Sequence, residues 1–238
     1  MRQFFGTRRR QPELMDQPGL DQGAHRDALA GLRRINRLSR TGRLAWSAIE
    51  RLTALDPQRT WRVLDLASGG GDVAIDVARR ALRRGRKVLV DACDISPFAV
   101  RYANARAAER RVENVQFFRC DVLNEPWPEE GYDVVMCSLF MHHLDDETAV
   151  ALLSRMAAAA KRLVVVNDLR RSAIGYLLAW LGCRLLTQSR VVHVDGPRSM
   201  EAAFSLEEIR KVVDRSGLKN VLVQPRWPCR FLLQWRPA

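Results

Sequence analysis

Acidic side chains stand near the ends of three successive apolar runs in this 238-residue chain. Asp65 lies in WRVLDLA, Asp94 in KVLVDACDIS and Asp121 in NVQFFRCDV. Such runs are typical of buried parallel strands, whose carboxyl ends meet at one edge of a sheet. A carboxylate there can attract a cationic amine, accept the two hydroxyls of a ribose, or accept an exocyclic amine. Together, three acids in this arrangement suit a nucleoside that is joined to an amino acid.

A glycine cluster at residues 69–71 follows the first acid and precedes a helical pattern. Glycine lets a ligand lie against bare peptide groups, and the next helix offers its N-terminal amides. Gly69, Gly71 and Ala74 also match the dinucleotide fingerprint, but Asp65 would repel a pyrophosphate. An NAD-linked oxidoreductase is therefore disfavoured. The acids and glycines together indicate S-adenosylmethionine (SAM) as the cofactor.

The segment VLDLASGGGD resembles the first motif of class I SAM-dependent methyltransferases, with Ala67 in place of the first glycine. CDVLNEPWP and YDVVMCSLFMHHLDD are also similar to that family, and the resemblance covers roughly residues 60 to 170. It implies that Asp65, Ala67, Gly69 and Gly71 face the methionine part of SAM. It further implies Asp94 and Ile95 at the ribose, Asp121 and Val122 at the adenine, and Cys137 and Ser138 near the sulfonium.

Two histidines, His142 and His143, follow the fourth expected strand and stand beside the expected methyl site. Histidine suits a general base near neutral pH, so one of the pair could take a proton from the acceptor. The alternative is that it only hydrogen-bonds the loop. Asn167 and Asp168 end the fifth strand, where they would bind the acceptor or cap the following helix.

The apolar stretch AIGYLLAWLGCRLLT lies where this family inserts elements that cover the substrate. It is either a buried packing helix or the wall of a greasy pocket, with Tyr176 and Trp180 as candidate substrate contacts. Arginines flank the stretch, so contact with a membrane surface stays open.

The net charge of +12 comes almost wholly from arginine, which is spread over every expected helix. This spread favours solvated helix faces over a nucleic-acid footprint. Enzymes that methylate base amino groups commonly have an N-P-P-Y-like loop where this chain has CSLF at residues 137–140. An RNA-modifying enzyme is therefore the disfavoured alternative, although ribose and ring-carbon methylation stay open. A non-catalytic SAM-binding protein is disfavoured because Asp65, Gly69, Gly71 and Asp94 are intact.

The stretch RINRLSRTGRLAW resembles the segment before the first motif of ubiquinone/menaquinone C-methyltransferases, through Asn36, Ser39, Gly42 and Trp46. The resemblance implies a lipophilic phenolic, polyketide-like or quinone-like acceptor. Oxygen is the favoured target atom. Carbon methylation of a quinone precursor comes next, because a phenolate reacts at either atom.

Five cysteines show no C-x-x-C pair and no zinc-like spacing with the four histidines. This pattern predicts reduced, buried thiols and no metal site. The first residues lack a signal-peptide pattern, and the apolar stretch AIGYLLAWLG is too short to span a bilayer. We therefore expect a cytoplasmic protein, whose oligomeric state the sequence leaves open.

Strands and helices alternate after Pro57. This order predicts an α/β fold with a doubly wound, mostly parallel, seven-stranded sheet, the Rossmann-like methyltransferase fold. We expect residues 1–20 to be flexible, 21–57 to form a helical appendage, and 58–238 to form the SAM-binding domain with a helical lid insertion at 171–204. The appendage should bury Ala28, Leu29, Leu32, Ile35, Leu38, Trp46, Ile49 and Leu52.

Overall fold

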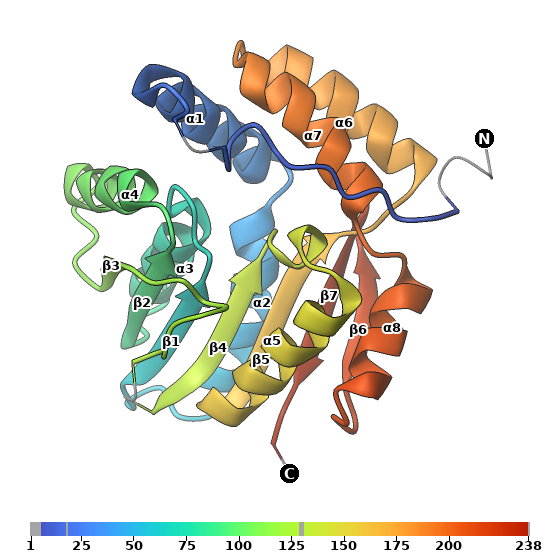
Figure 1. The fold of residues 1–238 in the computed structure, drawn as a ribbon. Coiled ribbons are helices and arrows are strands. Elements are labelled where there is room, and N and C mark those ends of the chain that lie inside the picture. The colour runs from blue at the N-terminus through green and yellow to red at the C-terminus, as the bar shows by residue number, and fades with distance from the viewer. Residues whose placement is uncertain (1–5, 18, 129–130, 238) are drawn as a thin grey trace.

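The computed structural model describes residues 6–17, 19–128 and 131–237, built around a seven-stranded sheet of order β3-β2-β1-β4-β5-β7-β6 (Figure 1). The strands are β1 (Trp61–Leu66), β2 (Val88–Asp94), β3 (Val115–Arg119), β4 (Tyr132–Ser138), β5 (Ala160–Leu169), β6 (Leu222–Arg226) and β7 (Arg230–Trp235). Strands β1 to β5 run parallel, and β7 is antiparallel to both β5 and β6. The predicted mostly parallel, seven-stranded sheet is confirmed.

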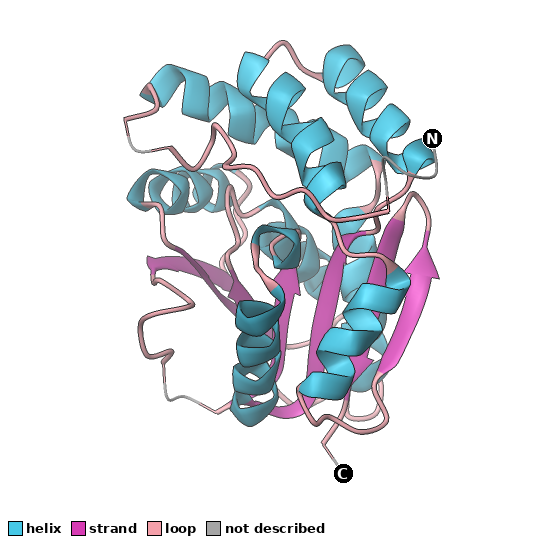
Figure 2. Ribbon diagram, turned by 45° about the vertical axis from the view of Figure 1, so that its right-hand side comes forward, coloured by secondary structure: helices cyan, strands magenta, loops and turns pink. Residues whose placement is uncertain are grey.

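Helices cover both faces of the sheet and the edge at which its parallel strands end (Figures 1 and 2). They are α1 (Gln22–Leu38), α2 (Thr41–Thr53), α3 (Asp72–Arg83), α4 (Pro97–Glu109), α5 (Asp146–Ala159), α6 (Ala173–Leu186), α7 (Arg190–Ala202) and α8 (Leu206–Arg215). The α2–α4 group lies on one face and α5 with α8 on the other. Above the carboxyl edge lie α1, α6 and α7, which form a roof.

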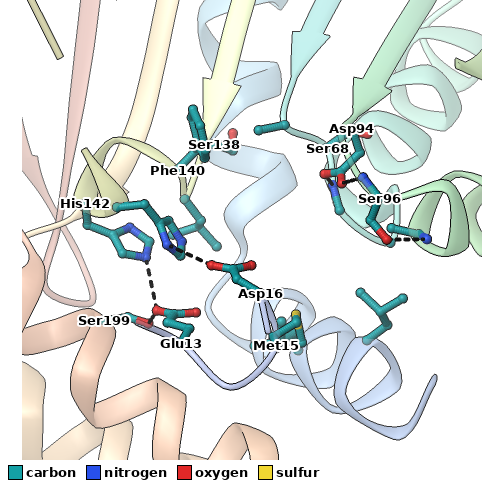
Figure 3. Close-up of a pocket in the computed structure, with 18 of the residues that line it drawn as sticks. Glu13, Met15, Asp16, Ser68, Asp94, Ser96, Ser138, Phe140, His142 and Ser199 are labelled. Carbon is teal, nitrogen blue, oxygen red and sulfur yellow. Dashed lines mark hydrogen bonds and ion pairs between the residues drawn. The ribbon is translucent and has the colours of Figure 1, made fainter. Parts of the chain in front are cut away.

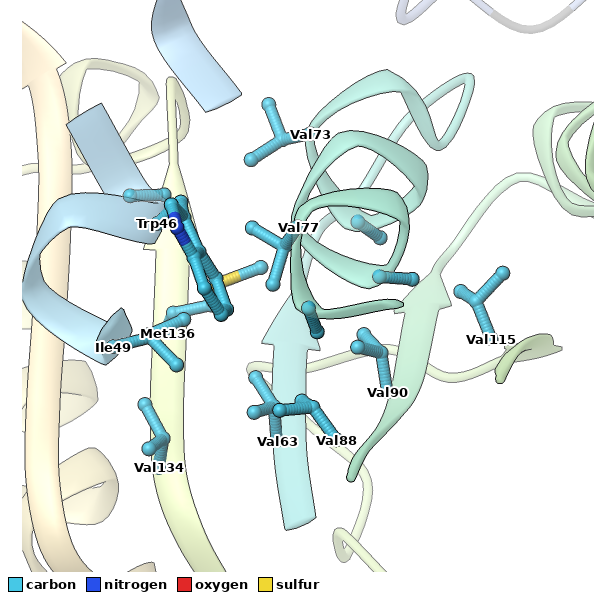
Figure 4. Packing of buried hydrophobic residues seen from close by; sticks show 14 of the residues in the cluster. Trp46, Ile49, Val63, Val73, Val77, Val88, Val90, Val115, Val134 and Met136 are labelled. Atoms are coloured by element: carbon cyan, nitrogen blue, oxygen red, sulfur yellow. The ribbon is translucent and has the colours of Figure 1, made fainter. Parts of the chain in front are cut away.

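The core consists of one apolar layer on each face of the sheet. Adjacent strand residues such as Val63 and Leu64 point to opposite faces, and both are fully buried. Trp46 of α2 packs into the first layer beside Met136, as Figure 4 shows. Because both faces are covered, the central strands are apolar along nearly their whole length.

The predicted inward faces of the two N-terminal helices are buried, except near one helix end. Ala28, Leu29, Trp46, Ile49 and Leu52 are buried, and Leu32 and Ile35 line a cavity. Leu38 is 68% exposed, so the prediction was wrong at this residue. Leu38 is the last residue of α1. The chain turns away from the helix axis two residues later, at Arg40, whose φ is 55°.

Helix α7 is a helix that the sequence did not predict, because its interior contains Gly196 and Pro197. Both residues usually interrupt helices. Packing explains the exception: a Cβ on Gly196 would lie 2.3 Å from Sγ of Cys183 on α6. The close approach of α6 and α7 outweighs the helix-breaking preference of these two residues. Both helices lie within the range 171–204 that we expected to form a lid insertion.

All five cysteines are free and buried, as predicted. In the part of the chain that the structure describes, no helix is both long and apolar enough to cross a membrane.

Candidate active site

A cavity of about 830 Å³ lies at the carboxyl edge of the sheet, where parallel α/β sheets bind their ligands. Gly69, Asp94 and Ser138 contribute to it from the ends of β1, β2 and β4. The roof consists of α1, α6, α7 and the N-terminal segment 6–17 (Figures 1 and 3). This volume lies within the range of small-molecule sites, roughly 300–1,000 Å³.

The loop after β1 takes positive φ angles at Ala67 (52°), Gly69 (53°) and Gly71 (74°). Ala67 and Gly69 line the cavity. Gly71 is not part of the lining, and a Cβ on it would lie 2.6 Å from the ring of Phe117. Glycine is therefore needed at position 71 for the backbone angle and for packing beneath the loop, not for direct contact with a ligand.

Asp65 is 1% exposed, and neither of its carboxylate oxygens has a hydrogen-bond partner among the described residues. Burial, together with the charges of Asp72 and Asp94, raises the pKa of this carboxyl well above its usual range. A buried polar group without a partner is costly and calls for an explanation. Asp65 itself is not part of the cavity lining, although the loop residues that follow it, 67–70, are.

Asp94 joins the glycine loop to the start of α4. Its Oδ2 accepts a hydrogen bond from the Gly69 N–H at 2.7 Å, and its Oδ1 accepts one from the Ser96 N–H at 2.9 Å. Burial raises the pKa of Asp94 in spite of these two hydrogen bonds. The carboxylate lines the cavity, as the prediction for a ribose contact requires.

The other residues predicted at the nucleoside end also line the cavity. These are Ile95, Asp121 and Val122. Asp121 accepts hydrogen bonds from the Asn124 side chain at 2.9 Å and from the Leu123 N–H at 3.0 Å, and these lower its pKa.

The two residues predicted near the sulfonium occupy different positions. Ser138 lines the cavity, and its buried Oγ has no hydrogen-bond partner among the described residues. Cys137 is fully buried in the core layer on the α5 side of the sheet and is not part of the lining. The alternation of side chains along β4 separates the two, so only Ser138 can face a ligand.

His142 forms a buried pair with Asp168. It lies in the short helix η1 (Met141–His143) after β4, and its Nδ1 is 2.7 Å from Oδ1 of Asp168 at the end of β5. Oδ2 of the same carboxylate accepts the backbone N–H of His142 at 3.2 Å. Both side chains are almost fully buried, and His142 lines the cavity. Since a carboxylate accepts the Nδ1 proton, neutral His142 carries its lone pair on Nε2.

Burial lowers the pKa of His142, but the charge and hydrogen bond of Asp168 and the charge of Glu13 outweigh it, so the pKa is raised. The adjacent His143 behaves differently. Burial and the charge of His142 lower the pKa of His143 to about 3. His142 is therefore the member of the pair whose surroundings stabilise a proton.

Glu13 faces His142 from the opposite side to Asp168. Its Oε1 is 3.9 Å from Nε2 of His142, and it accepts a hydrogen bond from Ser199 (Figure 3). Burial raises the pKa of Glu13 to about 7. Donor atoms of Glu13, His142 and His143 lie within 4.8 Å of one another, close enough for a metal ion. Of these groups, Glu13 Oε1 also accepts the hydrogen bond from Ser199, and Nδ1 of His143 lies 3.5 Å from Oδ2 of Asp16.

Comparison with known proteins agrees with this geometry. The family described as "Methyltransferase domain" matches residues 63–162. An uncharacterized methyltransferase of Mycobacterium tuberculosis is 27% identical over 191 residues, which cover 78% of this chain and 91% of that protein. The ubiquinone biosynthesis O-methyltransferase of Acinetobacter baylyi is 27% identical over 173 residues, which cover 70% of each chain.

The fold is shared with magnesium protoporphyrin IX methyltransferase of Synechocystis, solved with bound S-adenosylhomocysteine (SAH). The TM-score is 0.56 at 18% identity, over 94% of this chain and 91% of that one. The protein is a SAM-dependent methyltransferase. Its cofactor is SAM.

The methyltransferase contains an anchored N-terminal segment where the sequence predicted a flexible one. Residues 1–5 and 18 lie outside the described residues, but 6–17 contact the body of the protein. Nη2 of Arg8 donates to the backbone carbonyls of His142 at 3.2 Å and Leu144 at 2.9 Å. The backbone N–H groups of Leu14 and Met15 donate to the Asp195 carboxylate on α7. These contacts carry Glu13 into the cavity, and no sequence motif signals them.

Arg230, at the start of β7, is a second cavity residue of the methyltransferase that the sequence did not indicate. It is 3% exposed, and its Nη2 donates to Oγ of Ser39 at 2.9 Å. Its Nε and Nη1 have no partner among the described residues. Burial lowers the pKa of Arg230 to about 10, although Asp168 and Asp72 oppose this change. It is still a cation near neutral pH.

The four residues predicted to bind the acceptor, Asn167, Asp168, Tyr176 and Trp180, do not line the cavity. Asp168 instead pairs with His142, which does. Asn167 is fully buried and donates weakly to the Thr41 carbonyl, at 3.5 Å. Tyr176 and Trp180 lie on other sides of α6, and the exposed Trp180 ring packs against the guanidinium of Arg184. The inner face of α6 consists instead of Leu178, Ala179, Gly182 and Cys183.

Proposed function

We propose that the enzyme transfers the SAM methyl group to a small, lipophilic acceptor of phenolic, polyketide-like or quinone-like structure, at oxygen. The observation that carries this proposal is the His142–Asp168 pair in the cavity wall. A phenol must lose a proton as it attacks the sulfonium methyl group. An imidazole that is buried, oriented by a carboxylate and free at Nε2 suits this step.

In this proposal the cofactor occupies the half of the cavity nearest β1 and β2. Asp65 would pair with the methionine ammonium, Arg230 with the carboxylate, and Asp94 with the ribose hydroxyls. Among the described residues, both carboxyl oxygens of Asp65 and two of the guanidinium nitrogens of Arg230, Nε and Nη1, lack hydrogen-bond partners. The ammonium and the carboxylate of an amino acid could satisfy them. Ile95, Asp121 and Val122 would surround the adenine.

The acceptor would then occupy the half of the cavity below α1, α6 and α7. This part of the lining is apolar and includes Leu29, Leu32, Ile35 and Leu178. His142 stands at its edge. An apolar wall with one placed base favours a greasy aromatic acceptor over a sugar or a nucleic-acid base. The Acinetobacter relative, which is named for O-methylation in ubiquinone biosynthesis, supports the same class.

Carbon methylation is the second candidate, because the same base would produce a phenolate that reacts at ring carbon as well as oxygen. A panel of catechols, phenolic acids and reduced quinones should separate the two. SAH release would be measured for each acceptor, and the products identified by mass spectrometry and NMR. Methoxy products support the proposal. Ring-methyl products alone would assign the enzyme to carbon, and transfer to RNA alone would contradict the small-molecule acceptor.

A further inference from the structure

Arginines converge on a second cavity, of about 530 Å³, between α1, α3 and α4. We call it the arginine groove, and its nine arginines are Arg33, Arg34, Arg37, Arg40, Arg79, Arg80, Arg83, Arg106 and Arg110. Only two carboxylates line it, those of Asp72 and Asp76. Arginines occur on every α-helix, as the sequence indicated, but these nine, from α1, α3, α4 and the turns after α1 and α4, line one hollow.

Few of these arginines are neutralised within the protein. Arg80 pairs with Asp76 at 2.7 Å, while Arg34 and Arg106 donate to the backbone carbonyls of Leu186 and Gly70. Within residues 6–17, 19–128 and 131–237, the other six side chains have neither a hydrogen bond nor an ion pair: Arg33, Arg37, Arg40, Arg79, Arg83 and Arg110. Converging like charges repel one another, so this arrangement favours an anionic occupant.

We propose that the arginine groove binds a small, freely diffusing ligand that carries two or more phosphate groups. Guanidinium groups form paired hydrogen bonds with phosphate oxygens, and several around one hollow can hold clustered phosphates. The volume lies in the range of small-molecule sites, whereas a nucleic-acid backbone needs an extended basic track.

The groove shares a wall with the cofactor cavity. Asn36 and Asp72 line both, and the Asn36 side-chain amide donates to Asp72 at 2.8 Å. On the same wall, Nη1 of Arg106 donates to the Gly70 carbonyl of the glycine loop at 2.9 Å. A ligand in the groove would therefore lie directly behind the loop that faces SAM. The groove proposal does not depend on the nature of the methyl acceptor.

Calorimetric titration of the full chain with inorganic tripolyphosphate, at constant ionic strength, tests the proposal. We expect one saturable site. The double variant Arg37→Gln/Arg83→Gln should weaken tripolyphosphate binding by at least about tenfold, because each substitution removes a charge-assisted contact with phosphate. The matched control Arg101→Gln/Arg210→Gln removes two exposed helical arginines outside the groove and should change the affinity by less than about twofold. The single variant Arg110→Gln tests the groove independently and should also weaken tripolyphosphate binding.

Absence of saturable tripolyphosphate binding would overturn the proposal. Equal weakening in the groove and control variants would also overturn it, because it would show that binding depends only on the total charge of the protein. Saturable binding of an oligoribonucleotide that tripolyphosphate does not displace would assign the groove to nucleic acid instead and also overturn it. SAH titration of each variant shows separately whether the cofactor site is intact.

Discussion

At the scale of single residues, the proposed chemistry depends on how Asp168 and Glu13 flank His142. Asp168 holds the ring through one hydrogen bond at Nδ1 and the His142 backbone N–H through another, which leaves Nε2 on the side of Glu13 and the cavity. This is the orientation that a base needs in order to accept a proton from a bound acceptor. The neighbouring His143 has no such carboxylate partner at hydrogen-bond distance; its Nδ1 is 3.5 Å from Asp16.

Replacing Asp168 should reveal the base in the pH profile. His142 must be neutral to act, and its raised pKa means that kcat should fall as the pH drops through a value above 6.5. In Asp168→Asn burial dominates and lowers the pKa of His142, so the fall should move to lower pH. The maximal kcat should also drop by roughly 10²–10⁴-fold, because orientation is lost.

The measurement is kcat against pH for the wild type, Asp168→Asn and Asp214→Asn, a control that removes an exposed acid on α8. If the Asp168 variant keeps the wild-type profile, His142 is not the titrating base.

Asp65 should make the ligand-free enzyme less stable as the pH rises. The unfolded carboxyl titrates near its ordinary pKa of about 3.9, whereas the folded pKa is much higher because of burial. Between these values the folded state binds the extra proton, so stability falls with increasing pH. Thermal unfolding of Asp65→Asn should lack this part of the pH dependence, and SAH should bind more weakly. Identical pH slopes for the two proteins would rule out an unpaired Asp65.

At the scale of elements, the N-terminal segment 6–17 forms part of the cavity wall through Glu13, Met15, Asp16 and Gln17. Arg8 holds it through two backbone carbonyls near η1, a third on Ala202 of α7, and the ring of Phe204. The position of the segment therefore depends on η1 and α7, which are far from it in the sequence. Its contribution could not be predicted from the sequence because 129 residues separate Glu13 from His142.

Arg8→Ala should destabilise the protein by about 1–3 kcal/mol, which is the range for losing hydrogen bonds made by a charged group. Arg10→Ala is the matched control, because Arg10 is more exposed and should cost less than about 1 kcal/mol. Denaturant unfolding would measure both variants. Equal losses, or none, would show that the segment is not anchored through Arg8.

Helix α6 shows what the sequence could and could not predict about the residues that line the cavity. Its apolar composition indicated a substrate-covering helix, and its inner face does line the cavity. Tyr176 and Trp180 nevertheless lie outside the lining. Ile174, Leu177 and Leu185 on the outer face are apolar as well, so composition does not identify the inner face. A helix that is apolar all round carries no periodic signal for its inner face. Packing against α7 decides which side faces inward.

At the scale of the whole molecule, the fold and cofactor residues were the most predictable features. Apolar runs, glycines and strand-end acids are local signals, and most of the indicated residues do line one cavity. Asp65, Gly71 and Cys137 are not part of the lining. Gly71 is set by packing beneath the loop and Cys137 by the alternation of strand faces, which the motif does not show. Glu13, Arg230 and the arginine groove arise from long-range packing, which no local spacing encodes.

The exposed apolar face of α6 lies on a protein with a net charge of +12, which suggests contact with an anionic membrane surface. We expect the enzyme to co-sediment with vesicles containing anionic lipid. Leu177→Glu/Leu185→Glu should reduce binding severalfold, because both side chains are more than 60% exposed on that face. Leu222→Glu, on β6, is the control for an exposed apolar residue elsewhere. Unchanged vesicle binding by the α6 variant would show that this face does not contact the membrane.

The most direct test of the proposed chemistry is to separate catalysis from cofactor binding in His142→Gln. Once an acceptor is found, kcat and the SAH dissociation constant would be measured for this variant and for His193→Gln, a control whose histidine lies outside the cavity. If His142 is the base, kcat should fall by roughly 10²–10⁴-fold while SAH affinity stays within about twofold. Unchanged kcat in a variant that still binds SAH would contradict a base at His142.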